Sequence, residues 1–277
     1  PFLGKVELIG VSHGGQGAAL NAALSRCRGD IVAFLESDDV WVPGKLKAVL
    51  DCLTNDPELS AVQHSMNQVD AELKPLPTEL PPPRRQTLAD FLSGRSLLTG
   101  LSALTVRRET LKRFLPLPAD LVTCVDDYLH PRLLLAGPVM HLAEPLGLRR
   151  VHGRNFYAGI RQDPSRLKLY LDLSSTLDAH LHSFLKEQGQ ALSDENDRKR
   201  RMTRLELELF WHRSQGLWRA ALDDWMQVVA LCGWRPYSLF KSSTLAVALV
   251  SPQFYFLLMR VYENQSWLPR LRRALLP

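Results

Sequence analysis

The sequence lacks several features that would place it in a well-marked class. Its four cysteines are far apart and form no C-x-x-C pair, so neither a disulfide framework nor a zinc site is indicated. A reducing compartment fits this usage best. No G-K-[ST] follows the glycine cluster HGGQG, which excludes a Walker loop there. The most apolar C-terminal stretch, Thr244 to Met259, is divided by Pro252 and falls short of the approximately 20 residues that a transmembrane helix needs.

What is present indicates a folded α/β protein. A chain of 277 residues with 45% hydrophobic content can hold one α/β domain and a smaller partner. The net charge of +5 is compatible with nucleic acid, anionic lipid or a phosphorylated substrate. Much of the excess comes from Arg198 to Arg204 and from Arg270 to Arg273, which favours a local surface role over a continuous basic groove. We therefore expect no nucleic-acid partner.

The chain is organised around the stretch DIVAFLESDDVWVPGK, from Asp30 to Lys45. Ile31 to Leu35 is a short apolar run, which predicts a strand that is buried on both faces. Ligands of open parallel sheets bind beyond the carboxyl ends of strands, so the acids that follow are positioned to hold a hard divalent cation. The alternative is that they cap the helix that Pro43 introduces and remain solvated. The polar residues concerned are Glu36, Ser37, Asp38 and Asp39.

An earlier segment predicts a strand, a glycine turn and a helix. Val6 to Val11 has the composition of a buried strand, and a helix is expected from about Gln16 to Cys27. The intervening glycines allow close approach to a ligand, and the helix start offers N–H groups to an anion. An ordinary strand-to-helix turn is an equally open interpretation. Asn21 lies in a helix face of small residues, where an amide usually needs a partner, although a plain surface position is also open.

The middle of the chain predicts further α/β elements. We expect a helix from Lys45 to Leu53 and strands at Leu59 to Met66 and at Ser102 to Arg107. Lys74 to Pro83 contains five prolines, which favour an exposed loop. Such a loop either contacts a variable substrate or is a passive connector.

A second acidic cluster begins a predicted helix that ends near Gly137. Asp126 and Asp127 are either favourable charges at the positive end of that helix or include a general base that takes a proton from an attacking hydroxyl. A strand follows at Val139 to Leu142. The next segment, LGLRRVHGRN, brings together groups that could meet a diphosphate or complete a metal shell, although a lone histidine is more often structural. These are Arg149, Arg150, His152 and Asn155.

Beyond about Asp163 the pattern is helical. Helices are predicted at Leu167 to Leu185, Asp194 to Arg213 and Gly216 to Leu231, most simply as a hairpin that packs on the first domain. The last segment has the aromatic and basic composition of an interfacial helix beside anionic lipid, and core packing is the competing interpretation. Its aromatic and basic residues are Tyr255, Phe256, Trp267, Arg270, Arg272 and Arg273.

Four segments in this order, GGQGAALNAAL, GDIVAFLESDDVWVPGKL, DDYLHPRLLLAG and EPLGLRRVHGRN, resemble family 2 glycosyltransferases of the GT-A fold. The resemblance covers residues 3 to 156. It implies a Rossmann-like α/β domain over residues 1–160, with a mostly parallel sheet and flanking helices. An all-helical region over residues 161–277 would follow, for which membrane association is a further expectation.

The resemblance also implies a reaction and the residues for it. An inverting enzyme would move a sugar from a nucleotide-diphosphate sugar to an acceptor hydroxyl, with Mg²⁺ or Mn²⁺ as the divalent metal. Asp127, with Asp126 beside it, would be the catalytic base. The metal would be held by Asp38, Asp39 and His152. The nucleotide sugar would be bound by Gly15, Gln16, Asn21, Glu36, Ser37, Asp38 and Arg150.

The sequence departs from the family pattern in two ways. Glu36 stands where the D-x-D element usually begins with Asp. The family's first strand and its base-binding second strand would lie upstream of Pro1, so we expect a fragment with incomplete donor binding.

The expected setting is envelope glycan or polysaccharide synthesis, with a glycan or lipid-linked acceptor. The expected location is the cytoplasm, peripheral at the inner face of the plasma membrane. A catalytically impaired nucleotide-binding protein and a membrane adaptor are the alternatives.

Overall fold

The computed structural model describes residues 6–153, 155, 160–232 and 236–264. The chain forms two compact units. The first comprises residues 1–158 and 173–193, and the second comprises residues 159–172 and 194–277. The sequence predicts one division, at residue 160, whereas the chain passes between the units three times because helix α6 (Pro164–Glu187) contributes to both.

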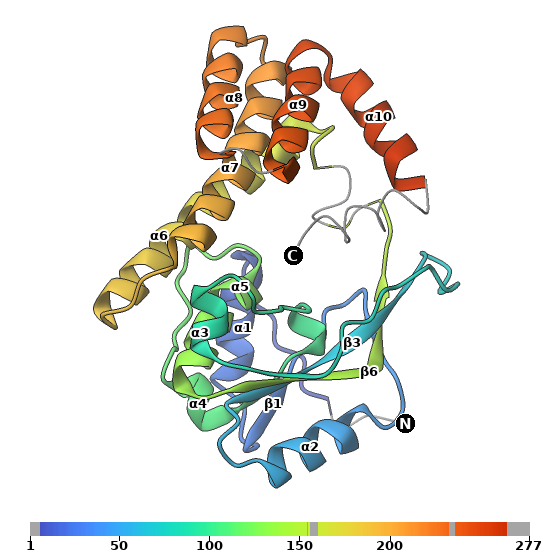
Figure 1. The fold of residues 1–277 in the computed structure, drawn as a ribbon. Helices are drawn as coiled ribbons and strands as arrows, with labels where there is room; N and C mark the ends of the chain where they lie inside the picture. The colour runs from blue at the N-terminus through green and yellow to red at the C-terminus, as the bar shows by residue number, and fades with distance from the viewer. Residues whose placement is uncertain (1–5, 154, 156–159, 233–235, 265–277) are drawn as a thin grey trace. The chain divides into compact units, whose positions relative to one another are not determined.

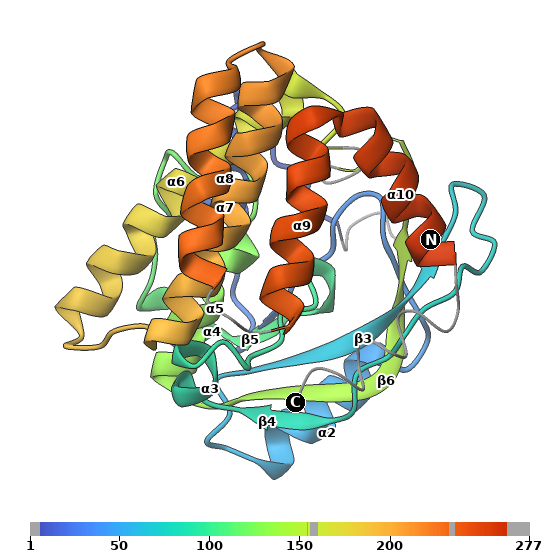
Figure 2. The ribbon, with the colours of Figure 1, turned by 45° about the horizontal axis from the view of Figure 1, so that its top comes forward.

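A mixed sheet forms the centre of the first unit (Figure 1). Its strands run in the order β1-β5-β3-β6-β2, and the short β4 pairs with β6 along that strand's first part (Figure 2). The described strands are β1 (Ile31–Ala33), β2 (Val40–Trp41), β3 (Ala61–Val69), β4 (Arg84–Gln86), β5 (Thr105–Arg107) and β6 (Val139–Arg150).

The strand directions correct part of the predicted fold class. The α/β class, the flanking helices and the helical C-terminal region are confirmed, but among the described strands only β3 and β6 pair in parallel. Parallel strands need a long crossover, and the chain between β3 and β6 supplies one. The short β5 runs back between β1 and β3, so its two pairings are antiparallel. The crossover includes α3 (Leu88–Leu92), η1 (Leu101–Ala103), α4 (Arg108–Lys112) and α5 (Val125–Ala136).

Two strand predictions need correction. The strand predicted at Val6 to Val11 is not formed, because none of the described strands hydrogen-bonds to it, and Leu8 is 95% exposed. The strand predicted at Ile31 to Leu35 is present but ends at Ala33. Its burial alternates rather than covering both faces: Val32 and Phe34 are buried, whereas Leu35 is 49% exposed.

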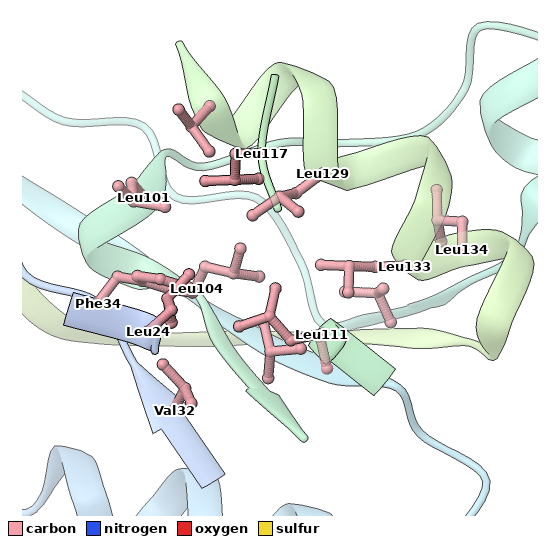
Figure 3. Close-up of a cluster of buried hydrophobic side chains, with 14 of the residues drawn as sticks. Leu24, Val32, Phe34, Leu101, Leu104, Leu111, Leu117, Leu129, Leu133 and Leu134 are labelled. Atoms are coloured by element: carbon pink, nitrogen blue, oxygen red, sulfur yellow. The ribbon is translucent and has the colours of Figure 1, made fainter. Parts of the chain in front are cut away.

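Helices cover both faces of the sheet in the first unit. Helices α1 (Gly15–Leu24), α3 and α5 lie on one face and α2 (Lys45–Asn55) lies on the other (Figure 1). The larger core cluster joins Leu24 of α1 and Leu129 and Leu133 of α5 to Val32 and Phe34 (Figure 3). The α2 face buries a smaller cluster of Val49, Leu53, Leu59, Val62 and Leu146. Helices α1, α2 and α5 agree with the predicted positions, although α1 ends at Leu24 rather than near Cys27. The short helix α3 was not predicted.

The proline-rich segment is a loop, as predicted. Between β3 and β4 the described backbone forms neither helix nor ladder, apart from one bridge that joins Val69 and Pro75. Its contact with a substrate stays a prediction.

The second unit is helical. It contains α7 (Asp194–Ser214), α8 (Trp218–Cys232), α9 (Pro236–Val250) and α10 (Pro252–Asn264). Its core includes Leu209, Ala221 and Val228. Helices α7 and α8 begin and end close to the predicted residues. Pro252, which was expected to divide the last apolar stretch, does so as the first residue of α10.

The prediction of an interfacial C-terminal helix is wrong for two of its aromatic residues. The rings of Tyr255 and Phe256 lie 5.2 and 5.3 Å from the ring of Phe210, so both belong to the helical core. The other residues of that prediction, Trp267, Arg270, Arg272 and Arg273, lie outside the described residues. In the part of the chain that the structure describes, no helix is long and apolar enough to cross a bilayer.

Candidate active site

A cleft of about 470 Å³ lies in the first unit. It is lined by residues from six segments: the start of α1, the acidic loop after β1, the last part of β3, the residue before η1, the start of α5, and the end of β6 with the turn after it. We define the acidic loop as residues 36–39. The lining residues are Gln16, Glu36, Asp38, Asp39, Gln68, Gly100, Thr123, Cys124, Asp126, Arg149, Arg150, Val151 and Asn155. The two predicted acidic clusters therefore converge on one cavity.

Backbone hydrogen bonds fix the acidic loop. The Glu36 N–H donates to the Ser102 hydroxyl at 2.9 Å, and the Asp39 N–H donates to the Glu36 carbonyl at 3.3 Å. The Asp39 carboxylate accepts the Arg150 N–H at 3.1 Å, which ties the loop to the end of β6. Ser37 is exposed and is not among the lining residues, so Glu36, Asp38 and Asp39 are the members of this loop that reach the cleft.

Asp38 faces His152 and Asn155. The Asp38 Oδ2 atom lies 3.3 Å from His152 Nε2 and 3.4 Å from Asn155 Nδ2. Asn155 also donates to the Arg150 carbonyl at 3.0 Å and accepts the His152 N–H, so it holds the turn after β6 in place. His152, which the resemblance assigns to the metal together with Asp38 and Asp39, thus lies beside Asp38, and its role as a metal ligand stays a prediction.

The donor set suits a metal that a substrate helps to hold. Among the described residues, no group of three or more His, Cys, Asp and Glu side chains is arranged as a metal site. Asp38 and His152 are instead a pair, and Asp39 is engaged by the Arg150 backbone. Mg²⁺ is commonly bound by one or two carboxylates together with substrate phosphates and water, so Asp38 could supply one carboxylate of a site that a phosphate completes.

Gln16 connects the acidic loop to the start of α5. Its side-chain nitrogen donates to Glu36 at 3.2 Å, and its side-chain oxygen accepts the Val125 N–H at 3.0 Å. Gly15 adopts a φ of +78°, and a Cβ there would lie 2.6 Å from the Val122 backbone. Gly15 thus lets the start of α1 approach the 121–122 backbone, whereas the sequence interpretation assigned the close approach to a ligand.

Asn21 is turned away from the cleft. Its amide donates to the Leu117 carbonyl at 2.9 Å and accepts the Leu117 N–H at 2.8 Å. The predicted need for a partner is thus met by the backbone. Neither Asn21 nor Gly15 is among the residues that line the cleft.

The two adjacent acids of α5 have different surroundings. Asp126 is partly buried and lines the cleft, whereas Asp127 is exposed and is not among the lining residues. Burial raises the pKa of Asp126, while backbone N–H donors and the Arg149 charge act in the opposite direction. By position, Asp126 is better placed than Asp127 to meet a group bound in the cleft.

The cleft concentrates negative charge in a partly desolvated place. Burial, followed by the charges of Asp126, Asp39 and Asp38, raises the pKa of Glu36 to about 7. Burial also raises the pKa of Asp39, against hydrogen bonds from Ser102 and the Arg150 backbone. Arg149 lowers the pKa of all three of Glu36, Asp39 and Asp126. The Nε atom of Arg150 is buried without a hydrogen-bond partner.

Sequence reasoning missed several of the lining residues. Arg149 was grouped with Arg150 as a possible contact of a diphosphate, but only Arg150 was assigned to the nucleotide sugar, and nothing in the sequence separates the two. Gln68 lies one residue before the end of β3 and Thr123 lies just before α5, and both enter the cleft only through the fold. Ser102 does not line the cleft but fixes the acidic loop, and a single serine carries no signal of that role.

Comparison with known proteins finds matches to the part of the chain that contains the acidic loop. Residues 2–114 match the model of Glycosyl transferase family 2. An uncharacterized glycosyltransferase of Nostoc sp. is 29% identical over 159 residues, which cover 54% of this chain and 48% of that protein. An uncharacterized protein of Mycobacterium tuberculosis is 28% identical over 141 residues, which cover 48% of this chain and 38% of that protein.

One solved structure similar to this chain is the crystal structure of S. aureus TarS 1–349. Its TM-score is 0.43 at 18% sequence identity, over 91% of this chain and 77% of that one. The matches to the curated relatives span about half of their length or less. The matched region contains the acidic loop, and the cleft is completed by residues beyond it. Through residues 2–114, the chain is therefore similar to glycosyl transferase family 2.

Proposed function

We propose that this chain is an inverting glycosyltransferase that moves a sugar from a nucleotide-diphosphate sugar to an acceptor hydroxyl. The observation that carries the proposal is the convergence of the acidic loop and the start of α5 on one cleft in a chain similar to family 2. An inverting displacement needs a group that neutralises the leaving diphosphate and a base on the opposite side of the sugar. Two acidic clusters from separate segments can divide these tasks.

The acidic loop is the proposed site of a divalent cation, Mg²⁺ or Mn²⁺. Asp38 and His152 would hold it, and Asp39 would support it through the loop. When bound, the cation would offset the charge that develops on the diphosphate. Arg149 and Arg150 also line the cleft, and the unpartnered Nε of Arg150 is a donor available to a phosphate oxygen.

Asp126 is the proposed base. A carboxylate that takes a proton from a hydroxyl works best when its pKa is raised toward the working pH, and burial acts in that direction on Asp126. This assignment shifts the role from Asp127, which the family pattern favours. Asp127 stays a candidate if the acceptor approaches from the exposed side of the helix start.

For the acceptor and the pathway, we propose only a chemical class and a general setting. A hydroxyl of a glycan or of a lipid-linked glycan would fit a family 2 enzyme, and envelope polysaccharide synthesis at the inner face of the plasma membrane would be its setting. The competing proposal is a nucleotide-binding protein with impaired catalysis, which the replacement of the first D-x-D acid by Glu36 favours. A membrane adaptor has less support, because Tyr255 and Phe256 pack in the helical core.

The test is release of nucleoside diphosphate from a panel of nucleotide sugars, measured with Mn²⁺, with Mg²⁺ and with a chelator. We expect one donor to give metal-dependent release, and Asp38→Asn to reduce the rate by about 100-fold or more. Asp51→Asn is the matched control, because Asp51 pairs with Lys47 on the exposed side of α2.

The alternatives give different results. Binding of a nucleotide sugar by calorimetry without turnover would favour the impaired nucleotide-binding protein. Turnover that a chelator and Asp38→Asn leave unchanged would contradict the metal assignment. A chain that neither binds nor turns over any donor would contradict the proposed function.

A further inference from the structure

Lys45, at the start of α2, is buried without a counter-ion. Its side chain is 1% exposed, and no carboxylate of the described residues lies within ion-pair distance of its Nζ. The ammonium donates to the Ser102 carbonyl at 2.9 Å and lies 3.6 Å from the centre of the Trp41 ring. Burial lowers the pKa of Lys45 to about 7. Burying an ammonium in this way is costly, so an apolar residue would serve better if packing were the only requirement.

Ser102 is the point on which these contacts converge. Its carbonyl accepts both the Lys45 ammonium and the Trp41 indole N–H, the latter at 3.0 Å. Its hydroxyl accepts the Glu36 N–H and lies near enough to the Asp39 carboxylate to lower the pKa of that group. One residue therefore joins the buried lysine on one side to the acidic loop on the other.

Ser102 is itself held rigidly. It lies in η1 and is fully buried, and its neighbours Leu101 and Leu104 are 3% and 1% exposed in the larger core cluster (Figure 3). Gly100, next to this segment, lines the cleft. The segment is thus a fixed part of the core to which a neighbouring loop can be anchored.

We propose that Lys45 and Ser102 are positioning residues that hold the acidic loop in the geometry required for cation and donor binding. Lys45 fixes the Ser102 carbonyl and the Trp41 ring, and Ser102 fixes the backbone of Glu36 at the start of the acidic loop. Neither residue touches the reacting groups. The inference rests on the proposed function for its catalytic consequence, whereas its structural part stands without it.

The structural part is tested by NMR hydrogen exchange on the full chain. In Ser102→Ala, exchange of the Glu36 amide should accelerate about tenfold, because that amide loses its acceptor. In Lys45→Met, the acceleration should extend to the Trp41 indole N–H. Lys47→Met is the control, because Lys47 is a lysine on the same helix with an 80% exposed side chain. It should leave these rates unchanged.

The catalytic part uses the same variants. Ser102→Ala and Lys45→Met should lower kcat about tenfold or more and weaken Mn²⁺ affinity, while the KM for the acceptor stays close to that of the wild type. If Lys45 and Ser102 only stabilised the fold, the two substitutions would instead accelerate hydrogen exchange throughout β3. They would lower the fraction of active protein without changing its affinity for Mn²⁺.

Each outcome is decisive. Unchanged exchange at Glu36 and Trp41, or acceleration spread evenly over the first unit, overturns the proposal. If Lys45→Met does not fold, Ser102→Ala carries the test alone. If the wild type shows no transfer but the loop exchange changes as expected, the proposed function fails and the positioning role survives.

Discussion

The buried acids of the two units differ in the side chains that surround them. In the described part of the helical unit, each buried acid has a basic side chain as its own partner. Asp224, 5% exposed, accepts from His212 Nδ1 at 2.6 Å, and Glu206, 6% exposed, pairs with Arg161 at 2.8 Å. Such pairs satisfy the charges within the fold, so they join helices and leave no charge for a ligand to balance.

In the cleft of the first unit the acids face one another. Four carboxylates, from Glu36, Asp38, Asp39 and Asp126, line one cavity, and the mutual charges contribute to the raised pKa of Glu36. The cations in the described lining are Arg149 and Arg150, and the nearest contact of Asp38 is the His152 ring. The difference shows that a buried acid is not by itself a functional signal. An excess of acids over cations in a cavity is the signal, because it is relieved by a bound cation or proton.

The largest expected effect separates the two acids of α5. Asp126→Asn should lower the transfer rate by about 10²–10⁴-fold, because the amide cannot accept the acceptor proton. Asp127→Asn keeps the same helix-start chemistry and should stay within about tenfold of the wild type. Initial rates at saturating donor measure both. Equal losses in the two variants, or a larger loss in Asp127→Asn, would return the base to Asp127.

The next effect tests the paired acids of the second unit. His212→Ala leaves the buried Asp224 carboxylate without its hydrogen-bond donor and should lower the free energy of unfolding by about 2 kcal/mol. Urea unfolding measures this change. Below the denaturation range, the transfer rate per folded molecule should equal that of the wild type. A loss of rate without a loss of stability would show that the pair serves the reaction.

Much of the fold and part of the candidate site can be predicted from the sequence. Helix positions are local, because an apolar stripe of helical period specifies them, and the acidic strand end and the Asp126–Asp127 pair are visible in the same way. Strand direction is not local: β5 pairs with β1 and β3 only after the crossover is in place, so the mostly parallel sheet was a wrong prediction.

The side that each residue faces depends on packing. Adjacent residues of a helix differ by about 100° in direction, so whether Asp126 or Asp127 enters the cleft is set by how α5 lies on the sheet. Asn21 likewise needed a partner, and only the fold supplies Leu117. The role of Ser102 cannot be predicted from the sequence, because it depends on contacts with residues more than 50 positions away.

The smallest expected effect concerns the unpaired acids of the cleft. Burial and the neighbouring carboxylates raise the pKa of Glu36 in the folded protein to about 7, above its ordinary value of 4.5. Between these two pH values the folded protein binds more protons at Glu36 than the unfolded chain does. The free energy of unfolding therefore falls as the pH rises through this window. The Glu36→Gln variant has no such proton to lose, so its curve should not show this fall.

In the presence of a chelator, Glu36→Gln should thus gain stability relative to the wild type between pH 5 and pH 8, by about 1 kcal/mol after allowance for solvent screening. Thermal unfolding at both pH values measures the gain. Adding Mn²⁺ at pH 8 should raise the Tm of the wild type, because a bound cation offsets the same repulsion. Glu109→Gln is the control, because Glu109 is an exposed acid with its own Lys112 partner. A difference between Glu36→Gln and the wild type that does not change with pH would mean that the cleft acids are already balanced, as the acids of the helical unit are.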